Sequence, residues 1–153
     1  MTRPSALFLD TNVLLDATVP SRTNHVRVTN LLRSLPGITS LCISGQVVRE
    51  YVGVCTRPRS ANGLGLSTTD SLTNSKAFLR ITSCLEETSS VTQKWIDLVE
   101  DYGVSGKQVH DACIVATMLV HGVTNLVTAN LSDFRRYQGL IEPLSPEQVD
   151  INS

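Results

Sequence analysis

The sequence predicts an α/β domain in which helices cover both faces of a parallel sheet, a three-layer sandwich. Short apolar segments of strand type alternate along the chain with longer segments whose apolar residues recur every three or four positions, the period of an α-helix. This alternation favours parallel strands joined by helices. At 153 residues, with no internal repeat, low-complexity tract or linker, residues 1–153 are expected to form one domain with a buried core.

Strands and helices can be placed from these patterns in chain order. Strands are expected at 7–10, 41–43, 81–85, 126–128 and, with the weakest pattern, 140–143. Helices are expected at 23–35, 44–55, 68–79, from 90 onward, and 105–120. The five strands would form the single parallel sheet of the sandwich.

Local signals mark several of the element ends. Ser44 is a suitable N-cap for the helix that follows it, and Ser105 with Gln108 matches a capping box. Gly122 ends the last long helix. The segment 56–65, TRPRSANGLG, has the composition of a loop.

Composition excludes several classes of protein. A formal net charge of −1 gives no strong attraction to nucleic acid for the molecule as a whole, but leaves open an enzyme that contacts RNA locally. No apolar run reaches the roughly 20 residues that span a bilayer, and residues 1–4 begin no signal peptide. The cysteines are far apart, and we expect reduced core thiols of a cytoplasmic protein, not zinc ligands: Cys42, Cys55, Cys84 and Cys113.

Acidic residues follow the predicted strands where a parallel sheet binds ligands. Asp10 ends the first strand, and Asp133 lies five residues past the fourth. Glu50 lies on the polar face of the helix after the second strand, and Asp111 lies in the second turn of the most apolar helix. Because open α/β sheets bind ligands beyond the carboxyl ends of their strands, these acids are expected to meet at one edge.

Each acid alone also has a local explanation. Asp10 suits a turn, and Asp111 is favoured by the dipole at a helix N-terminus. Glu50 could be solvated on its polar face, and Asp133 could cap a short helix. His110 points about 100° away from its neighbour on the helix, which makes it incidental or supporting. The joint placement of the four acids is what indicates a functional site.

Four segments resemble the PIN domain family. They are FLDTNVLLD, GQVVREYVGV, VHDACIVATMLVHGV and LVTANLSDF, and the resemblance runs from about residue 6 to residue 144. It implies an α/β nuclease, usually with a parallel five-stranded sheet, that cuts single-stranded or structured RNA with Mg²⁺ or Mn²⁺. The small bacterial members are mostly VapC-type toxins of toxin–antitoxin pairs.

The resemblance also assigns roles to residues. It makes Asp10, Glu50 and Asp111 the first, second and third metal-binding acids. The residues that would support Asp10 or occupy the hydroxyl position after the fourth strand are Thr11, Asn12 and Thr128.

One position departs from the pattern of many relatives. They carry an acid directly after the fourth strand, where this chain has Asn130. An asparagine can offer a carbonyl oxygen but no charge, so the fourth acid here would be Asp133. A second metal site is therefore less strongly indicated than the first.

Clustered carboxylates account for the expected chemistry in physical terms. Because they repel one another, such a cluster takes up protons or binds a cation, and hard oxygen ligands suit Mg²⁺ or Mn²⁺. The ion would polarise a phosphoryl oxygen and lower the pKa of a bound water, and two ions about 3.5–4 Å apart would clamp the attacking and leaving oxygens. We expect Asp10 and Asp111 to be direct ligands, with Glu50 and Asp133 holding metal-bound waters.

Six arginines are available to contact RNA phosphates, which positions RNA without reading its sequence. They are Arg22, Arg49, Arg57, Arg59, Arg135 and Arg136. The partners expected besides RNA are a second copy of the chain and a possible cognate antitoxin. A homodimer is suggested by the family and by the number of apolar residues in the helices at 23–35 and 68–80.

Three other classes fit the sequence less well. A phosphatase of haloacid-dehalogenase type needs a second aspartate two residues after the first, where Asn12 stands. A receiver domain needs a late lysine, and no lysine follows Lys107. A catalytically inactive PIN-like RNA-binding module stays open, as does the choice between a toxin and a housekeeping nuclease.

Overall fold

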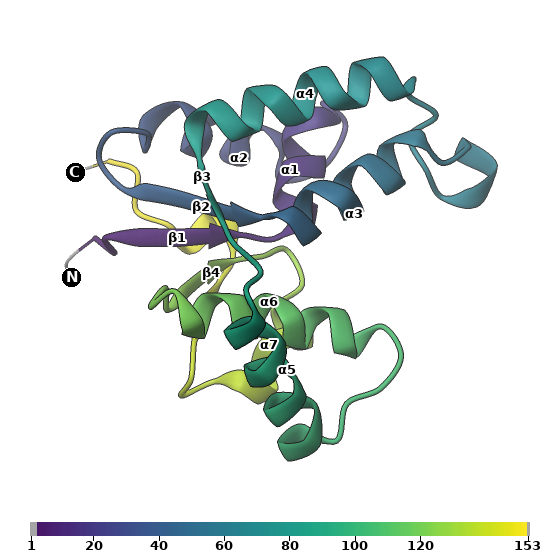
Figure 1. Cartoon of the computed structure of the whole chain (residues 1–153). Coiled ribbons are helices and arrows are strands. Elements are labelled where there is room, and N and C mark those ends of the chain that lie inside the picture. The colour runs from purple at the N-terminus through teal and green to yellow at the C-terminus, as the bar shows by residue number, and fades with distance from the viewer. Residues whose placement is uncertain (1–2, 153) are drawn as a thin grey trace.

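The computed structural model describes residues 3–152 and contains one five-stranded parallel sheet with the strand order β3-β2-β1-β4-β5 (Figure 1). Residues 1, 2 and 153, which the single-domain prediction includes, lie outside the described part. All neighbouring strands run parallel, as predicted. The strands are β1 (Ala6–Leu9), β2 (Ser40–Ser44), β3 (Ser83–Leu85), β4 (Asn125–Val127) and β5 (Glu142–Leu144).

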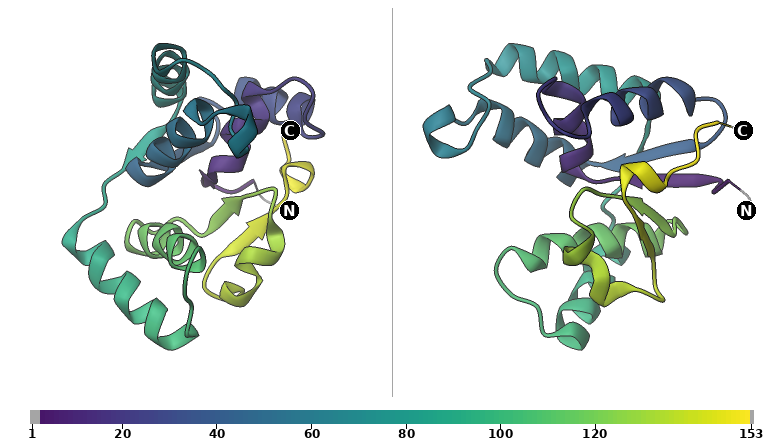
Figure 2. Two further views of the ribbon diagram at one scale, coloured as in Figure 1. Left: turned by 90° about the vertical axis from the view of Figure 1, so that its right-hand side faces the viewer. Right: turned by 180° about the vertical axis from the view of Figure 1, so that it is seen from behind.

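Helices cover both faces of this sheet. The chain steps from β1 to β2 to β3 in one direction and then crosses to β4 and β5 on the other side of β1. Because such crossovers are right-handed, the two sets of connections lie on opposite faces, and α1–α4 are separated from α5–α7 by the sheet (Figures 1 and 2). The helices are α1 (Thr11–Thr18), α2 (His25–Ser34), α3 (Gly45–Thr56), α4 (Thr68–Ile81), α5 (Ser89–Tyr102), α6 (Gln108–Val120) and α7 (Leu131–Phe134), with 3₁₀ turns at Arg59–Ala61, Arg135–Tyr137 and Pro146–Gln148. The predicted three-layer α/β sandwich is confirmed.

The central strand β1 occupies the switch point of the sheet. Its neighbours are β2 and β4, and the connections that lead to these two strands pass over opposite faces. The carboxyl ends of β1 and β4 therefore flank the crevice in which open α/β sheets bind ligands.

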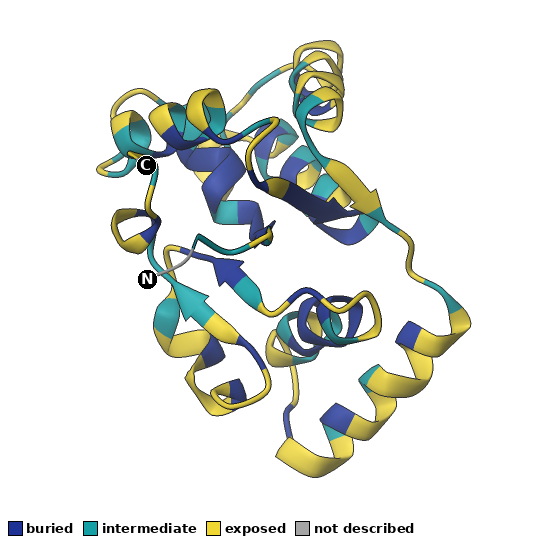
Figure 3. Cartoon of the chain, turned by 90° about the vertical axis from the view of Figure 1, so that its left-hand side faces the viewer, coloured by how far each residue is buried: buried dark blue, intermediate teal, exposed yellow. Residues whose placement is uncertain are grey.

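The core forms around β1 and α6. Leu7, Phe8 and Leu9 are fully buried, because both faces of the central strand are covered. Helix α6 is also buried along most of its length, whereas α5 packs on α6 and exposes most of its surface (Figure 3). The apolar character of α6 therefore reflects its place between the sheet and α5.

Several local details differ from the sequence predictions. Residues 11–18, to which no helix was assigned, form α1, and the helix expected at 23–35 begins only at His25. Ser44 occupies the N-cap position of α3, but its buried hydroxyl makes no hydrogen bond to any described residue. The capping box is absent, because a turn with Gly106 at φ +58° leads into α6, which begins at Gln108 itself.

The cysteines match the prediction only in part. All four are free, and two of them, Cys42 and Cys55, are buried. Cys113 is half-buried and Cys84 is exposed, because the latter lies on the edge strand β3. No helix within residues 3–152 combines the length and the apolar content that crossing a bilayer requires.

Candidate active site

A cleft of about 900 Å³ lies at the carboxyl edge of the sheet, the edge that faces the viewer in the left panel of Figure 2. All four acids from the predicted cluster line it, although they come from four separate segments: Asp10, Glu50, Asp111 and Asp133. Thr11, Asn12 and Asn130 also line the cleft. The structure thus brings the four acids together at the carboxyl edge of the sheet, as the sequence predicted.

Asp10 is held by donors on both of its carboxylate oxygens. Its Oδ1 accepts a hydrogen bond from the backbone N–H of Thr11 at 2.8 Å, which caps α1. Its Oδ2 accepts from the Thr128 hydroxyl at 2.8 Å and from the Asn12 side-chain amide at 2.9 Å. The side chains of Thr128 and Asn12 therefore hold the Asp10 carboxylate in place, in addition to the backbone N–H of Thr11.

The electrostatic state of Asp10 reflects opposing influences. Burial raises the pKa of its carboxyl, while the hydrogen bonds from Thr128 and Thr11 lower the pKa, and nearby Glu50 raises it further. The net direction is upward, because the residue is only 7% exposed. The three donors thus offset the penalty of burying this carboxylate only in part.

The ends of β1 and β4 are joined by the same side chains. Asn12 accepts a hydrogen bond through Oδ1 from the backbone N–H of Ala129 at 3.0 Å. The backbone N–H of Asn130 donates to the Thr128 hydroxyl, also at 3.0 Å. These bonds fix the loop after β4 against α1 and place Asn130 at the cleft.

Glu50 is also held at both oxygens. The Thr11 hydroxyl donates to its Oε2 at 2.9 Å, and the Gln46 side-chain amide donates to its Oε1 at 2.9 Å. The same amide donates to the backbone carbonyl of His110 at 2.8 Å. Glu50 is therefore an anchored carboxylate and not a solvated surface acid. Gln46 was not among the residues predicted from the sequence, because a polar residue on a helix gives no indication of such contacts.

Asp111 is the most strongly perturbed acid of the cleft. Burial and the negative charges of Asp10, Asp133 and Glu50 raise its pKa to about 7, and the guanidinium of Arg136 lowers the pKa only in part. Within residues 3–152 no hydrogen bond is donated to its carboxylate. The helix dipole therefore does not explain this residue, because the unfavourable charges around it prevail.

Asp133 lies inside the short helix α7 and is exposed. Asn130 occupies the N-cap position of that helix, and its carbonyl accepts the N–H of Asp133 at 3.1 Å. Asp133 is therefore not the capping residue, which removes its local explanation. Its charge contributes to the raised pKa of Asp111.

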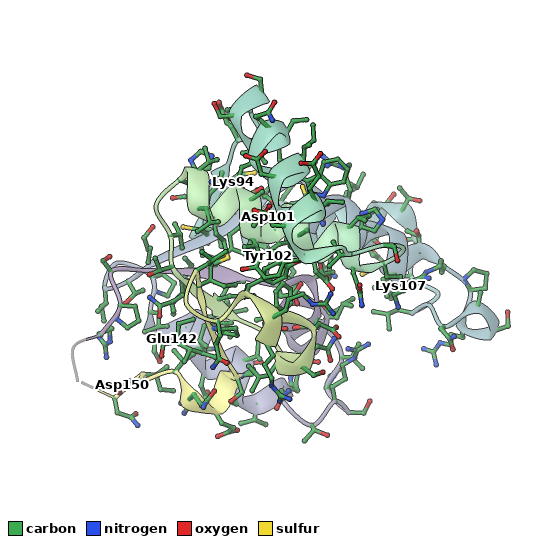
Figure 4. All side chains as sticks on the ribbon, turned by 90° about the horizontal axis from the view of Figure 1, so that it is seen from below. Lys94, Asp101, Tyr102, Lys107, Glu142 and Asp150 are labelled. Carbon is green, nitrogen blue, oxygen red and sulfur yellow. The ribbon has the colours of Figure 1, made fainter. Side chains whose placement is uncertain are left out.

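Basic residues line the cleft at two places. Arg57 lies at the end of α3, and Lys107 lies just before α6. Figure 4 shows Lys107 on the same side of the molecule as the loop between α3 and α4. Sequence analysis expected Arg57 here but not Lys107, since a single lysine in a loop carries no signal. Arg136 influences Asp111 and donates to Gln108 at 3.1 Å.

The other arginines lie elsewhere. Arg49 forms an ion pair with Glu87 at 3.0 Å, and Arg22 forms one with buried Asp16 at 3.3 Å. Neither lines the cleft, and the same is true of Arg59 and Arg135.

The donor set of the cleft suits a hard divalent cation. Every candidate ligand is a carboxylate or carbonyl oxygen, and the repulsion that raises the pKa of Asp111 is the kind that a cation relieves. Within residues 3–152 no three His, Cys, Asp or Glu side chains converge into a ready-made metal cage. The oxygen donors of the cleft are compatible with a hard divalent cation that keeps several waters and takes only one or two carboxylates directly.

The fold and the cleft together define a doubly wound α/β domain that gathers carboxylates at the switch point of its parallel sheet. The family model of the PIN domain matches residues 7–140, and the chain belongs to the PIN domain family. No curated protein matches the chain.

Solved structures of toxin–antitoxin proteins share this fold. A chain of VapBC2 from Rickettsia felis, bound to a promoter DNA fragment, is 20% identical with a TM-score of 0.69, and the match covers 92% of this chain and 98% of that one. A chain of a toxin–antitoxin complex from Klebsiella pneumoniae is 22% identical with a TM-score of 0.64, covering 93% and 98%. VapC20 from Mycobacterium tuberculosis, a sarcin–ricin loop cleaving toxin, is 19% identical with a TM-score of 0.59, covering 78% and 86%.

The raised pKa of Asp111 predicts a dependence of stability on pH. A carboxyl whose folded pKa lies near 7 instead of 3.8 destabilises the metal-free fold increasingly as pH rises through this window. Asp111→Asn removes that charge and should increase the free energy of unfolding by about 2 kcal/mol at about pH 8, a value reduced for partial solvent screening. Near pH 4 the folded parent and the variant should be equally stable. Urea unfolding with a chelator at both pH values measures this.

Asp97→Asn, on the exposed surface of α5, is the matched control and should show the same stability difference at both pH values. A pH-independent effect of Asp111→Asn would contradict the electrostatic account of the cleft.

Proposed function

We propose that this PIN domain protein is an Mg²⁺- or Mn²⁺-dependent endoribonuclease and the toxin component of a type II toxin–antitoxin pair. The observation that supports the proposal most is the convergence of four acids on one cleft whose walls also carry Arg57 and Lys107. Acids suit a divalent cation and bases suit a phosphate backbone, and a phosphodiester-cleaving site requires both.

The acids would divide the work of holding the ion. Asp10 and Asp111 would be direct ligands, and Glu50 and Asp133 would hold metal-bound waters, with Asn130 offering a carbonyl oxygen. When bound, the ion supplies Lewis acidity toward a phosphoryl oxygen and lowers the pKa of a bound water.

The remaining residues of the cleft would act on geometry and on the substrate. Thr11, Asn12 and Thr128 keep the Asp10 carboxylate in one orientation, because they bond to both of its oxygens or to its neighbours. Arg57 and Lys107 would bind phosphates on either side of the scissile bond. Such contacts position RNA without selecting its sequence.

An enzyme fits the cleft better than the alternatives. In a catalytically inactive RNA-binding module the acids would have no cation to hold, and their repulsion would remain without a function. In a phosphatase of haloacid-dehalogenase type the residue at Asn12 would be an acid. Here Asn12 is an amide bonded to Asp10 and to the backbone of Ala129.

Partner proteins are proposed on two grounds. The similar chains from Rickettsia felis and Klebsiella pneumoniae come from a VapBC protein and a toxin–antitoxin complex, which supports a cognate antitoxin for this chain. Val26 in the first turn of α2 and Ile38 in the loop between α2 and β2 are 70% and 63% exposed, and Leu72 and Leu79 on α4 are 43% and 38% exposed. These residues are available for contacts between copies of the chain.

The first functional prediction concerns Asp10→Asn. The substitution keeps shape but removes a charge from the proposed cation site, so Mg²⁺-dependent RNA cleavage should fall at least about 100-fold while the fold is retained. A cleavage time course and a circular dichroism spectrum measure the two effects. Asp97→Asn should cleave like the parent, and cleavage by a clean Asp10→Asn preparation at the parental rate would rule out the assignment.

A second prediction separates Asn130 from Asp133. If Asp133 supplies the fourth charge, Asp133→Asn should slow cleavage about tenfold at limiting Mg²⁺, and added Mn²⁺ should partly restore it. Asn130→Asp should strengthen metal binding but lower the metal-free melting temperature, because it adds a like charge. Saturating Mg²⁺ should reduce that loss of stability, since the ion binds only the folded state.

Melting curves with and without Mg²⁺, run beside a cleavage time course, measure these effects. If Asp133→Asn cleaves like the parent at limiting Mg²⁺, the site has three functional acids and not four.

The proposed homodimer has its own test. Most soluble oligomers are two-fold dimers, and the exposed apolar residues of α2 and α4 offer a surface for one. Light scattering at tens of micromolar should give twice the 16.6 kDa mass of the chain. Replacing Leu72 with aspartate tests whether α4 takes part, and a monomer mass for the parent would count against the assembly.

A further inference from the structure

Gln46 connects two of the acidic segments of the cleft. It lies on α3 one turn before Glu50 and is only 7% exposed. Its side-chain amide nitrogen donates to Glu50 Oε1 at 2.9 Å and to the backbone carbonyl of His110 at 2.8 Å. His110 immediately precedes Asp111 on α6, so a single amide links the carboxylate of one acid to the backbone beside another.

The orientation of this amide follows from its surroundings. A side-chain NH₂ group has two hydrogens, and here two acceptors lie within reach. A flipped amide would place its oxygen against the Glu50 carboxylate and the His110 carbonyl, which is repulsive. The Gln46 oxygen, Oε1, is buried and has no hydrogen-bond partner within residues 3–152.

This unpartnered oxygen distinguishes Gln46 from an ordinary buried polar residue. Leaving a buried acceptor without a donor is unfavourable, whereas an apolar side chain of the same shape carries no such penalty. The unpartnered oxygen therefore carries a cost that the hydrogen bonds donated by the NH₂ group must offset. The contacts that its NH₂ group makes to Glu50 and His110 are what an apolar side chain would lose.

Thr11 completes the arrangement from the other side. Its hydroxyl donates to Glu50 Oε2, and its backbone N–H donates to Asp10 Oδ1. Glu50 is thus tied through one oxygen to the segment of Asp10 and through the other to the segment of Asp111. No donor within residues 3–152 holds the Asp111 carboxylate itself, so its backbone neighbour is the point at which α3 fixes its position.

We propose that Gln46 is a positioning residue that sets the placement of Glu50 relative to Asp111 for the divalent cation. This inference rests on the proposed metal-dependent function. Residues that orient metal-binding groups without binding the metal themselves contribute about 10–100-fold to metal affinity, and Gln46, which bonds to Glu50, would act in this way.

The test measures Mn²⁺ binding to the full chain by calorimetry, independently of RNA cleavage. Gln46→Met has nearly the same length but no donor, and it should weaken Mn²⁺ binding about tenfold or more. The metal-free melting temperature should change little, because removing an unpartnered buried oxygen offsets the loss of the two hydrogen bonds that the amide donates. The Mn²⁺ concentration for half-maximal cleavage should rise by the same factor, with the rate at saturating Mn²⁺ nearly kept.

Two further variants sharpen the result. Gln93→Met makes the same chemical change on the exposed surface of α5 and should bind Mn²⁺ like the parent. Gln46→Asn keeps the amide but is one methylene shorter, so it cannot reach both acceptors and should also bind Mn²⁺ more weakly. It provides a folded test even if methionine disturbs the packing.

The outcomes separate this proposal from the proposed function. Parental Mn²⁺ affinity in Gln46→Met or Gln46→Asn overturns the positioning role alone, provided that the parent binds Mn²⁺ and cleaves RNA. A metal-free melting temperature of Gln46→Met well below the parental value makes Gln46 structural and also overturns it. A parent chain that neither binds Mn²⁺ nor cleaves RNA overturns the proposed function together with this inference.

Discussion

The structure depends on a carboxylate that is buried at the end of its central strand. β1 is covered on both faces, and Asp10 directly follows it with only 7% of its surface exposed. Such a charge is tolerated because three donors reach it, and two of them, Thr128 and Asn12, also bond to one another. Since these donors come from α1 and from the end of β4, satisfying Asp10 also joins the two strand ends that flank the cleft.

The four acids of the cleft fall into two kinds. Asp10 and Glu50 have donors on both oxygens and are fixed in orientation, whereas no donor within residues 3–152 engages Asp111 or Asp133. Burial, together with the charges of the other three acids, raises the pKa of Asp111 to about 7. The protein thus fixes the orientation of Asp10 and Glu50, while the carboxylates of Asp111 and Asp133 remain available to bind a ligand.

Strand ends made the acids predictable from the sequence, because a parallel sheet gathers its carboxyl ends at one edge and because each acid follows or faces such an end. The helix at 11–18 was not predicted, since its start, Asp10-Thr11-Asn12, also has turn chemistry. Gln46 and Lys107 could not be assigned roles either. Their contacts run to α6 and into the cleft, and contacts between distant segments leave no periodic pattern in the chain.

The net charge of −1 for the whole chain does not reveal that acidic and basic residues occupy separate places around the cleft. One acid directly follows β1 and the others lie on α3, α6 and α7, while Arg57 lies at the end of α3 and Lys107 just before α6. Arg49 and Arg22, which look equally available in the sequence, are neutralised by Glu87 and Asp16. Attraction of a polyanion to this protein would therefore depend on the few unpaired bases near the cleft, and a cation among the acids would extend that local positive field.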